Sequence, residues 1–174
     1  MPPLRFERVE TSVGPILVAE TEVGIAMVTR SDLIGPFLAS LQRRFPRREI
    51  LPAELDLGWL IDLLAGASVT LPPIDVAGLS PFDARVFRVV RSIPRGETMT
   101  YGEVAALAGS LGAARAAGGA MSRCPLFPAV PCHRVVRAAD GWSGWGADEA
   151  LKLRLLWLEG REPPTSSSWA RRQA

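Results

Sequence analysis

Residues 100–122, TYGEVAALAGSLGAARAAGGAMS, do most to decide the fold. Thr100 and Glu103 have the spacing of a capping box, and Gly109 is suited to end a helix of about two turns. A short turn then leads into a second helix, 113–122. Two short helices joined by a tight turn containing glycine predict a helix-turn-helix, although the spacing alone also fits an ordinary helical hairpin.

The second of these helices has an unusual surface. Nearly all of its side chains are Ala or Gly, and Arg115 is the only long polar side chain before Ser122. Small side chains allow either a large partner or a neighbouring helix to approach closely. Close helix packing explains the small residues but not the single arginine, so the helix is a candidate binding surface.

The chain upstream of this pair has a different character. The first thirty residues alternate and turn like a small antiparallel sheet, followed by two amphipathic helices. Residues 68–80 contain prolines and no helical period, which makes them the candidate linker. Ser80 and Pro81 then suit the N-cap and first position of a new helix.

These elements predict an α+β protein. We expect a small N-terminal antiparallel-sheet α/β scaffold domain at 1–78 and a mostly helical domain at 79–163 that contains a winged-helix-like helix-turn-helix. The tail at 164–174 is expected to be disordered.

A last helix is expected from Asp148 to Glu159. Leu151 and Leu155 mark its buried stripe, and a further step of four residues reaches Glu159. A carboxylate there continues an apolar face and lies at the negative end of the helix dipole. It is either a solvated helix end or a buried acid with a partner, for which the lone histidine, His133, is the natural candidate.

Composition narrows the class of protein. The hydrophobic content of 48% suffices for a core, the net charge of +2 is a weak sign of nucleic-acid binding, and Lys152 is the only lysine among 20 basic residues. With two cysteines and no signal peptide or membrane span, we expect a soluble cytoplasmic protein without disulfides. One histidine and two cysteines also predict no metal site, and we expect no cofactor.

The sequence PCHRVV, residues 131–136, places Cys132 beside His133. On an extended strand the two side chains would point to opposite faces, so a turn or a bridging water is needed for them to work together. A distant carboxylate such as Glu159 would complete a cysteine–base–acid relay. From these residues alone, an inert buried thiol is the commoner outcome.

PCHRVV resembles the active-site motif of the O(6)-alkylguanine-DNA alkyltransferases, the methylated-DNA–protein-cysteine methyltransferases. Three other segments resemble that family in order and spacing: TYGEVAALAG at 100–109, AARAAGGAM at 113–121 and LEG at 158–160. The similarity covers residues 80–160, and the N-terminal region matches in general shape.

The resemblance implies that Cys132 takes the alkyl group from O(6)-alkylguanine, irreversibly and once per molecule. O(4)-alkylthymine is a secondary candidate substrate. His133 would act as base, Glu159 would orient it, and Tyr101 would assist protonation of the departing guanine. The partner would be double-stranded DNA, bound through the minor groove by a monomer that flips the damaged base out of the stack.

Two further sets of residues follow from the resemblance. Arg115 would be the arginine that fills the space of the extruded nucleotide. The DNA-binding set also includes Tyr101, Ala114, Ala117, Gly118, Ala120 and Arg134. The substrate pocket is expected to be lined by Met121, Val135, Trp145 and Gly146.

The sequence departs from the family at three places. Cys124-Pro125 replaces the usual Asn-Pro pair, and Trp145 stands where the family has tyrosine. Paired glycines are missing at Ala147 and Asp148. We interpret these changes as altering selectivity. Alternatives to alkyl transfer are a non-catalytic lesion-binding protein, whose relatives carry tryptophan in place of the reactive cysteine, and a thiol hydrolase that does not bind DNA.

Overall fold

The computed structural model describes residues 1–145 and 148–162, and the contacts between residues divide the chain into two compact units. Unit 1 comprises Met1–Ala84 and Cys124–Val130, and unit 2 comprises Arg85–Arg123 and the chain from Pro131 onward. The expected disordered tail lies outside the described residues.

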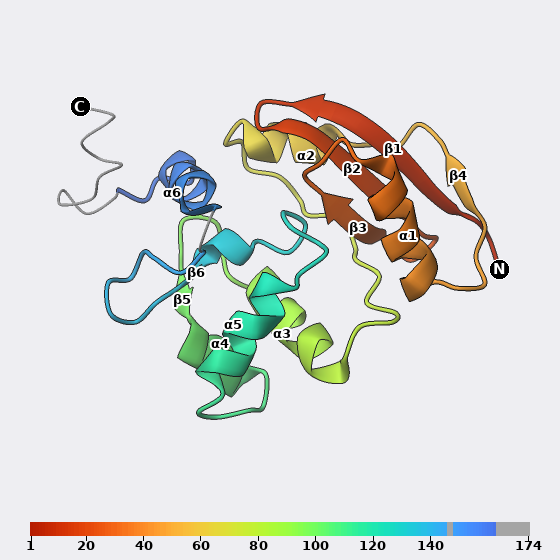
Figure 1. Cartoon of the computed structure of the whole chain (residues 1–174). Helices are drawn as coiled ribbons and strands as arrows, with labels where there is room; N and C mark the ends of the chain where they lie inside the picture. Colours follow the sequence, from red (N-terminus) through yellow and green to blue (C-terminus); the bar gives the residue numbers. More distant parts are fainter. Residues whose placement is uncertain (146–147, 163–174) are drawn as a thin grey trace. The chain divides into compact units, whose positions relative to one another are not determined.

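Unit 1 is built on a four-stranded sheet with the order β3-β2-β1-β4 (Figure 1). The first three strands form the expected antiparallel meander, whereas β4 pairs with β1 in parallel and was not foreseen. Their bounds are β1 Leu4–Thr11, β2 Gly14–Glu20, β3 Ile25–Thr29 and β4 Ile50–Pro52. The connection from β3 to β4 contains α1, Ile34–Arg44, and a shorter helix, α2, follows at Gly58–Leu64.

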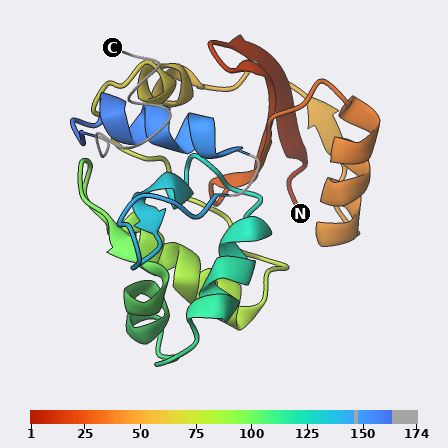
Figure 2. The same cartoon turned by 60° about the vertical axis from the view of Figure 1, so that its left-hand side comes forward.

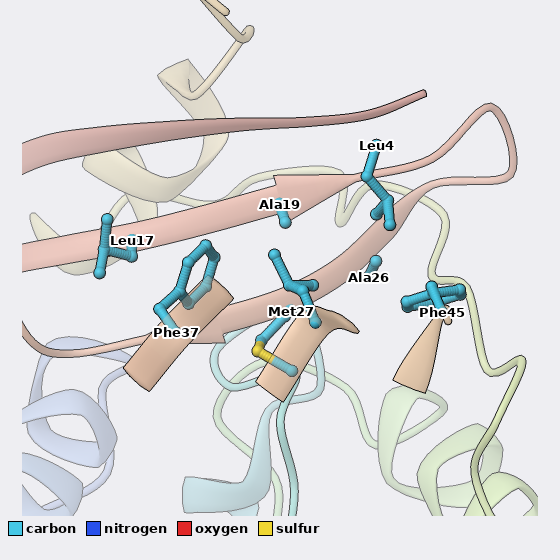
Figure 3. Packing of buried hydrophobic residues seen from close by; sticks show 8 residues of the cluster. Leu4, Leu17, Ala19, Ala26, Met27, Phe37 and Phe45 are labelled. Carbon is cyan, nitrogen blue, oxygen red and sulfur yellow. The ribbon is translucent and has the colours of Figure 1, made fainter. Parts of the chain in front are cut away.

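The core of unit 1 lies between the sheet and α1. Phe37 and Leu41 of α1 are buried, together with Phe45 directly after the helix. Figure 3 shows Phe37 close to Leu17 on the sheet, and its ring centroid lies 6.1 Å from that of Phe6. Burial of one such aromatic side chain contributes roughly 1.5–3 kcal/mol, so this cluster is what fixes α1 on the sheet.

The candidate linker at 68–80 contains no helix and is attached to unit 1. Ile74 forms an isolated bridge with Ile25, and the buried Asp75 accepts a hydrogen bond of 2.7 Å from the hydroxyl of Thr21. The later segment Cys124–Val130 joins the same unit, because Val28 N donates to Pro125 O at 2.7 Å.

Unit 2 holds the predicted helical pair and the cysteine motif. α4 and α5 pack against each other (Figure 1), and β5 pairs with β6 in parallel. The elements are α3 Pro81–Arg91, which begins in unit 1, then β5 Met99–Thr100, α4 Tyr101–Leu107, α5 Ala114–Ser122, η1 Cys132–Arg134, β6 Val135–Val136 and α6 Glu149–Leu158.

The local signals for the starts of α4 and α3 are confirmed. Glu103 N donates to Thr100 Oγ1 at 3.2 Å, and Thr100 N donates to Glu103 Oε2 at 2.7 Å, which is a complete capping box. Ser80 accepts from Asp83 N at 3.0 Å at the start of α3. Asp148 precedes α6 as expected, but its side chain caps no N–H group of that helix.

The protein is therefore a mixed α+β protein with a small sheet and several helices. Within the described ranges, no helix combines the length and the apolar character needed to cross a membrane.

Candidate functional site

Cys132 begins a short helical turn, η1. The backbone here is therefore not extended, as is needed for Cys132 and His133 to work together. The chain then enters β6, where Val135 pairs with Met99 of β5, the strand that directly precedes α4. Cys132 is 1% exposed and His133 is completely buried. The thiol and the imidazole therefore both lie away from bulk water.

His133 and Glu159 are brought together by η1 and α6, which pack against each other (Figure 2). His133 Nε2 lies 2.8 Å from Glu159 Oε1. Because an ionised carboxylate only accepts hydrogen bonds, Nε2 carries the proton and Nδ1 carries the lone pair. Burial lowers the pKa of His133, although Glu159 opposes this effect, so the ring is neutral at pH 7.

Glu159 is fixed by more than the histidine. Its carboxylate also accepts from Arg134, with Nε at 3.0 Å and Nη2 at 2.8 Å, and from Gly96 N at 3.2 Å. Burial acts to raise the pKa of Glu159, but hydrogen bonds and charges from His133 and Arg134 outweigh it and lower the pKa to about 2. The acid is thus ionised throughout the neutral range.

The expected contact of Arg134 with DNA is corrected by this geometry. Arg134 is 7% exposed, and its remaining terminal nitrogen, Nη1, donates to Ile93 O at 2.8 Å. Its charge is used inside the unit, on Glu159. The motif identified Arg134 as important, but only the fold shows that its side chain turns toward the acid.

Tyr101, the first residue of α4, lies against the loop that follows β6. Its hydroxyl donates a hydrogen bond to Gly144 O. Gly144 has a φ of +126°, and a Cβ built there would lie 2.8 Å from the Tyr101 oxygen. Only glycine fits so close to the ring without displacement. Burial raises the pKa of Tyr101, so the hydroxyl keeps its proton.

The loop after β6 is held from several directions. Asp140 Oδ1 accepts from the N–H groups of Trp142 and Ser143, each at 2.9 Å. The guanidinium of Arg161 lies 5.2 Å from the centre of the Trp142 ring. Trp145, a predicted pocket residue, is half-buried near the end of this loop. The predicted pocket residue Gly146 lies outside the described residues, as does Ala147.

Lys152 is a residue of this region to which sequence reasoning assigned no role. It is fully buried on α6, and Nζ donates to Val135 O at 2.6 Å and to Ser143 O at 3.0 Å. Val135, predicted to line the pocket, is itself fully buried. The one available signal was that Lys152 is the only lysine of a chain rich in arginine.

The small residues of α5 divide between two faces. Arg115 is exposed, and Ala114 and Gly118 are partly exposed. Ala117 and Ala120 are fully buried, so their expected role in contacting DNA is corrected: they allow α5 to pack closely inside the protein. Met121, expected to line the pocket, is also buried, at 6% exposure.

Neither cysteine forms a disulfide bond, and Cys124 is partly exposed. In the part of the chain that is described, no group of three or more His, Cys, Asp or Glu side chains could hold a metal ion.

Comparison with known proteins identifies the chain's relatives. Residues 81–161 match the family model described as 6-O-methylguanine DNA methyltransferase, DNA binding domain. A methylated-DNA–protein-cysteine methyltransferase of Methanothermobacter thermautotrophicus is 48% identical over 90 residues, which are 52% of this chain and 50% of that protein. The chain thus spans about half the length of such curated relatives.

Solved structures extend the similarity over nearly the whole chain. A variant of the Mycobacterium tuberculosis O6-methylguanine methyltransferase is 30% identical, with a TM-score of 0.69, and the match covers 94% of this chain and 96% of that one. A structure of Mycobacterium tuberculosis OGT in complex with DNA is 28% identical, with a TM-score of 0.71 and coverage of 89% and 92%. The chain belongs to the 6-O-methylguanine DNA methyltransferase family.

Proposed function

We propose that this protein repairs DNA by transferring an alkyl group from O(6)-alkylguanine to Sγ of Cys132, once per molecule and without a cofactor. The observation that carries the proposal is that His133, next to Cys132 in one short turn, has Nε2 at 2.8 Å from the buried carboxylate of Glu159. O(4)-alkylthymine is proposed as a second substrate.

The relay supplies a base for the thiol. With Nε2–H directed at Glu159, the lone pair on Nδ1 of His133 accepts the thiol proton, directly or through a water. Glu159 stabilises the resulting imidazolium, since it remains ionised with a pKa of about 2. Sγ then forms a bond to the alkyl carbon as the bond from that carbon to O(6) breaks.

The electron pair of the broken bond stays with the guanine, which takes up a proton and leaves as the unmodified base. Tyr101 is proposed to assist this protonation, because its hydroxyl is protonated and sits at the start of α4 within the same unit. The hydrogen bond to Gly144 O would then be exchanged for one to the base. The product is a thioether on Cys132.

The DNA-binding surface is proposed to be the exposed side of α5. Arg115 would enter the stack in place of the flipped nucleotide, while Ala114 and Gly118 would let the helix approach the minor groove. The complex with DNA of the Mycobacterium tuberculosis relative supports a DNA partner. The pairing of β5 and β6 beside α4, which itself packs on α5, supports a winged-helix-like arrangement.

The pocket is proposed to be formed by Met121, Val135, Trp145 and Gly146. We further propose that residues 79–163 act as the DNA-binding and alkyl-transfer domain, that residues 1–78 serve as its scaffold, and that the protein works as a cytoplasmic monomer. Light scattering of the protein alone and bound to a short duplex tests whether the protein is a monomer.

The central test is intact-protein mass spectrometry after incubation with duplex DNA containing O(6)-methylguanine. We expect a gain of one methyl group, located on the peptide that contains Cys132, and no gain for Cys132→Ala. Equal labelling of Cys132→Ala would place the acceptor elsewhere, for example at Cys124. Tight binding of the lesion without any mass gain would instead identify a non-catalytic lesion-binding protein.

A further inference from the structure

Burial of the Lys152 ammonium costs desolvation free energy, which other interactions of the fold must offset. It is the only lysine among 20 basic residues, and its side chain is fully excluded from solvent. An ammonium group removed from water is strongly destabilising unless it is hydrogen-bonded or paired. Two main-chain carbonyls accept hydrogen bonds from the Lys152 ammonium and meet this demand.

Its hydrogen bonds join two segments of the proposed site. Nζ donates to Val135 O at 2.6 Å, three residues after the nucleophile Cys132, and to Ser143 O at 3.0 Å, two residues before Trp145. One ammonium therefore links the segment that carries the thiol to the loop that carries the proposed pocket wall. Both acceptors are main-chain carbonyls, which hold the backbone itself.

The charges around Lys152 keep it a cation at neutral pH. Burial lowers the pKa of Lys152 to about 8, and the positive charge of Arg137 also lowers it. The negative charges of Asp140 and Glu149, together with Cys132, act to raise it. The group is mainly protonated at pH 7, so three N–H donors are available for the carbonyls.

Lys152 also shares a helix face with Glu159. The two residues are seven positions apart, which is almost two full turns and about 10 Å along the axis. Glu159 binds the side chains of His133 and Arg134, and Lys152 binds the carbonyl of Val135. Lys152 of α6 and Glu159 directly after it thus hold the Cys132 segment at two points.

We propose that Lys152 is a positioning residue for alkyl transfer, whose ammonium fixes the distance between the Cys132 segment and the Trp145 loop. The inference rests on the proposed function, since it assumes that a substrate base lies between the two segments. Transfer needs the alkyl carbon in line with Sγ, and displacement of one wall by about 1 Å is enough to cost up to about a hundredfold in rate.

The test measures single-turnover transfer from O(6)-methylguanine duplex as a function of DNA concentration, for wild type, Lys152→Met and Lys152→Gln. Methionine has a similar length without donors, whereas glutamine keeps an N–H₂ donor. Arg154→Met, an exposed position on the same helix, is the matched control. The fraction of molecules that react and the unfolding temperature are recorded for each variant.

We expect Lys152→Met to lower the maximal rate of the reacting fraction by about tenfold or more, with the DNA concentration at half-maximal rate changed by less than about twofold. Lys152→Gln should recover part of the loss, and Arg154→Met should match wild type. A merely structural role would lower only the reacting fraction and leave its rate unchanged.

Two outcomes overturn the inference: a Lys152→Met rate equal to wild type, or a glutamine variant no faster than the methionine variant. Wild-type protein that transfers no methyl group would overturn the proposed function instead, so the two failures are distinct.

Discussion

Arg134 binds Glu159 through two nitrogens, Nε at 3.0 Å and Nη2 at 2.8 Å, so the carboxylate that orients His133 is itself oriented. A bidentate guanidinium fixes the plane of a carboxylate as well as its position. Arg134 is therefore part of the buried hydrogen-bond network that includes Glu159 and His133.

Arg134→Gln should weaken alkyl transfer without changing the salt dependence of DNA binding, because the Arg134 guanidinium is buried on Glu159. Arg115→Ala should instead weaken DNA binding. We expect a lower affinity for DNA and a shallower slope of log K against log salt concentration. Titrations of unmodified duplex at several salt concentrations distinguish the two. A reduced slope for Arg134→Gln would restore Arg134 to the DNA surface.

Glu159→Gln should lower the single-turnover rate by about a hundredfold, since the amide oxygen carries no charge to stabilise the imidazolium of His133. The exposed Glu162 supplies the control substitution, Glu162→Gln, which should react as wild type. The rates are measured on the fraction of protein that remains folded. A Glu159→Gln variant with wild-type rate would show that orientation of His133 does not depend on the acid.

The contribution of Glu159 to stability should be lost at acid pH. Its pKa falls from 4.5 to about 2 on folding, so the stabilisation is complete above pH 4.5 and declines as pH falls toward 2. The shift corresponds to at most about 3 kcal/mol, because solvent screens part of the interaction. Urea unfolding at pH 7 and pH 2.5 should show the advantage of wild type over Glu159→Gln shrinking by most of its value. The pKa of the exposed Asp140 is also lowered, but its effect on stability is the same in both proteins and cancels in the comparison.

Gly144→Ala should be destabilising and should slow transfer. The new Cβ would lie 2.9 Å from Cε2 of Tyr101, and a φ of +126° is strained for alanine, at a cost of about 1–3 kcal/mol. Gly35→Ala in α1 has no atom within 4 Å and an ordinary helical conformation, so it should be neutral or stabilising. Thermal unfolding and transfer rates measure both. Equal stability of the two variants would contradict the close Tyr101–Gly144 packing.

The features that the sequence predicted well depend on residues that lie close together along the chain. The capping box of Thr100 and Glu103 depends on residues three apart, and it formed as expected. The phase of α6 placed Glu159 on a face where a carboxylate needs a partner, and the structure brings His133 to it. In both cases the physical demand is visible in the spacing of side chains along one helix.

The features that escaped prediction depend on backbone brought together by the fold. Lys152 binds carbonyls of Val135 and Ser143, which no side-chain pattern records. β4 was missed because a strand of three residues that ends in Pro52 carries no alternation. Arg134 was misplaced because a motif identifies a residue without giving the direction of its side chain.

The two side chains that hold the Cys132 segment are Lys152, within α6, and Glu159, directly after it, and α6 is the last helix of the described residues. During synthesis, Cys132 and His133 therefore leave the ribosome before the residues that orient them. A nascent chain that ends before Glu149 contains the thiol but neither the acid nor the ammonium. The hydrogen bonds from Glu159 and Lys152 that hold the Cys132 segment can therefore form only after α6 has been synthesised.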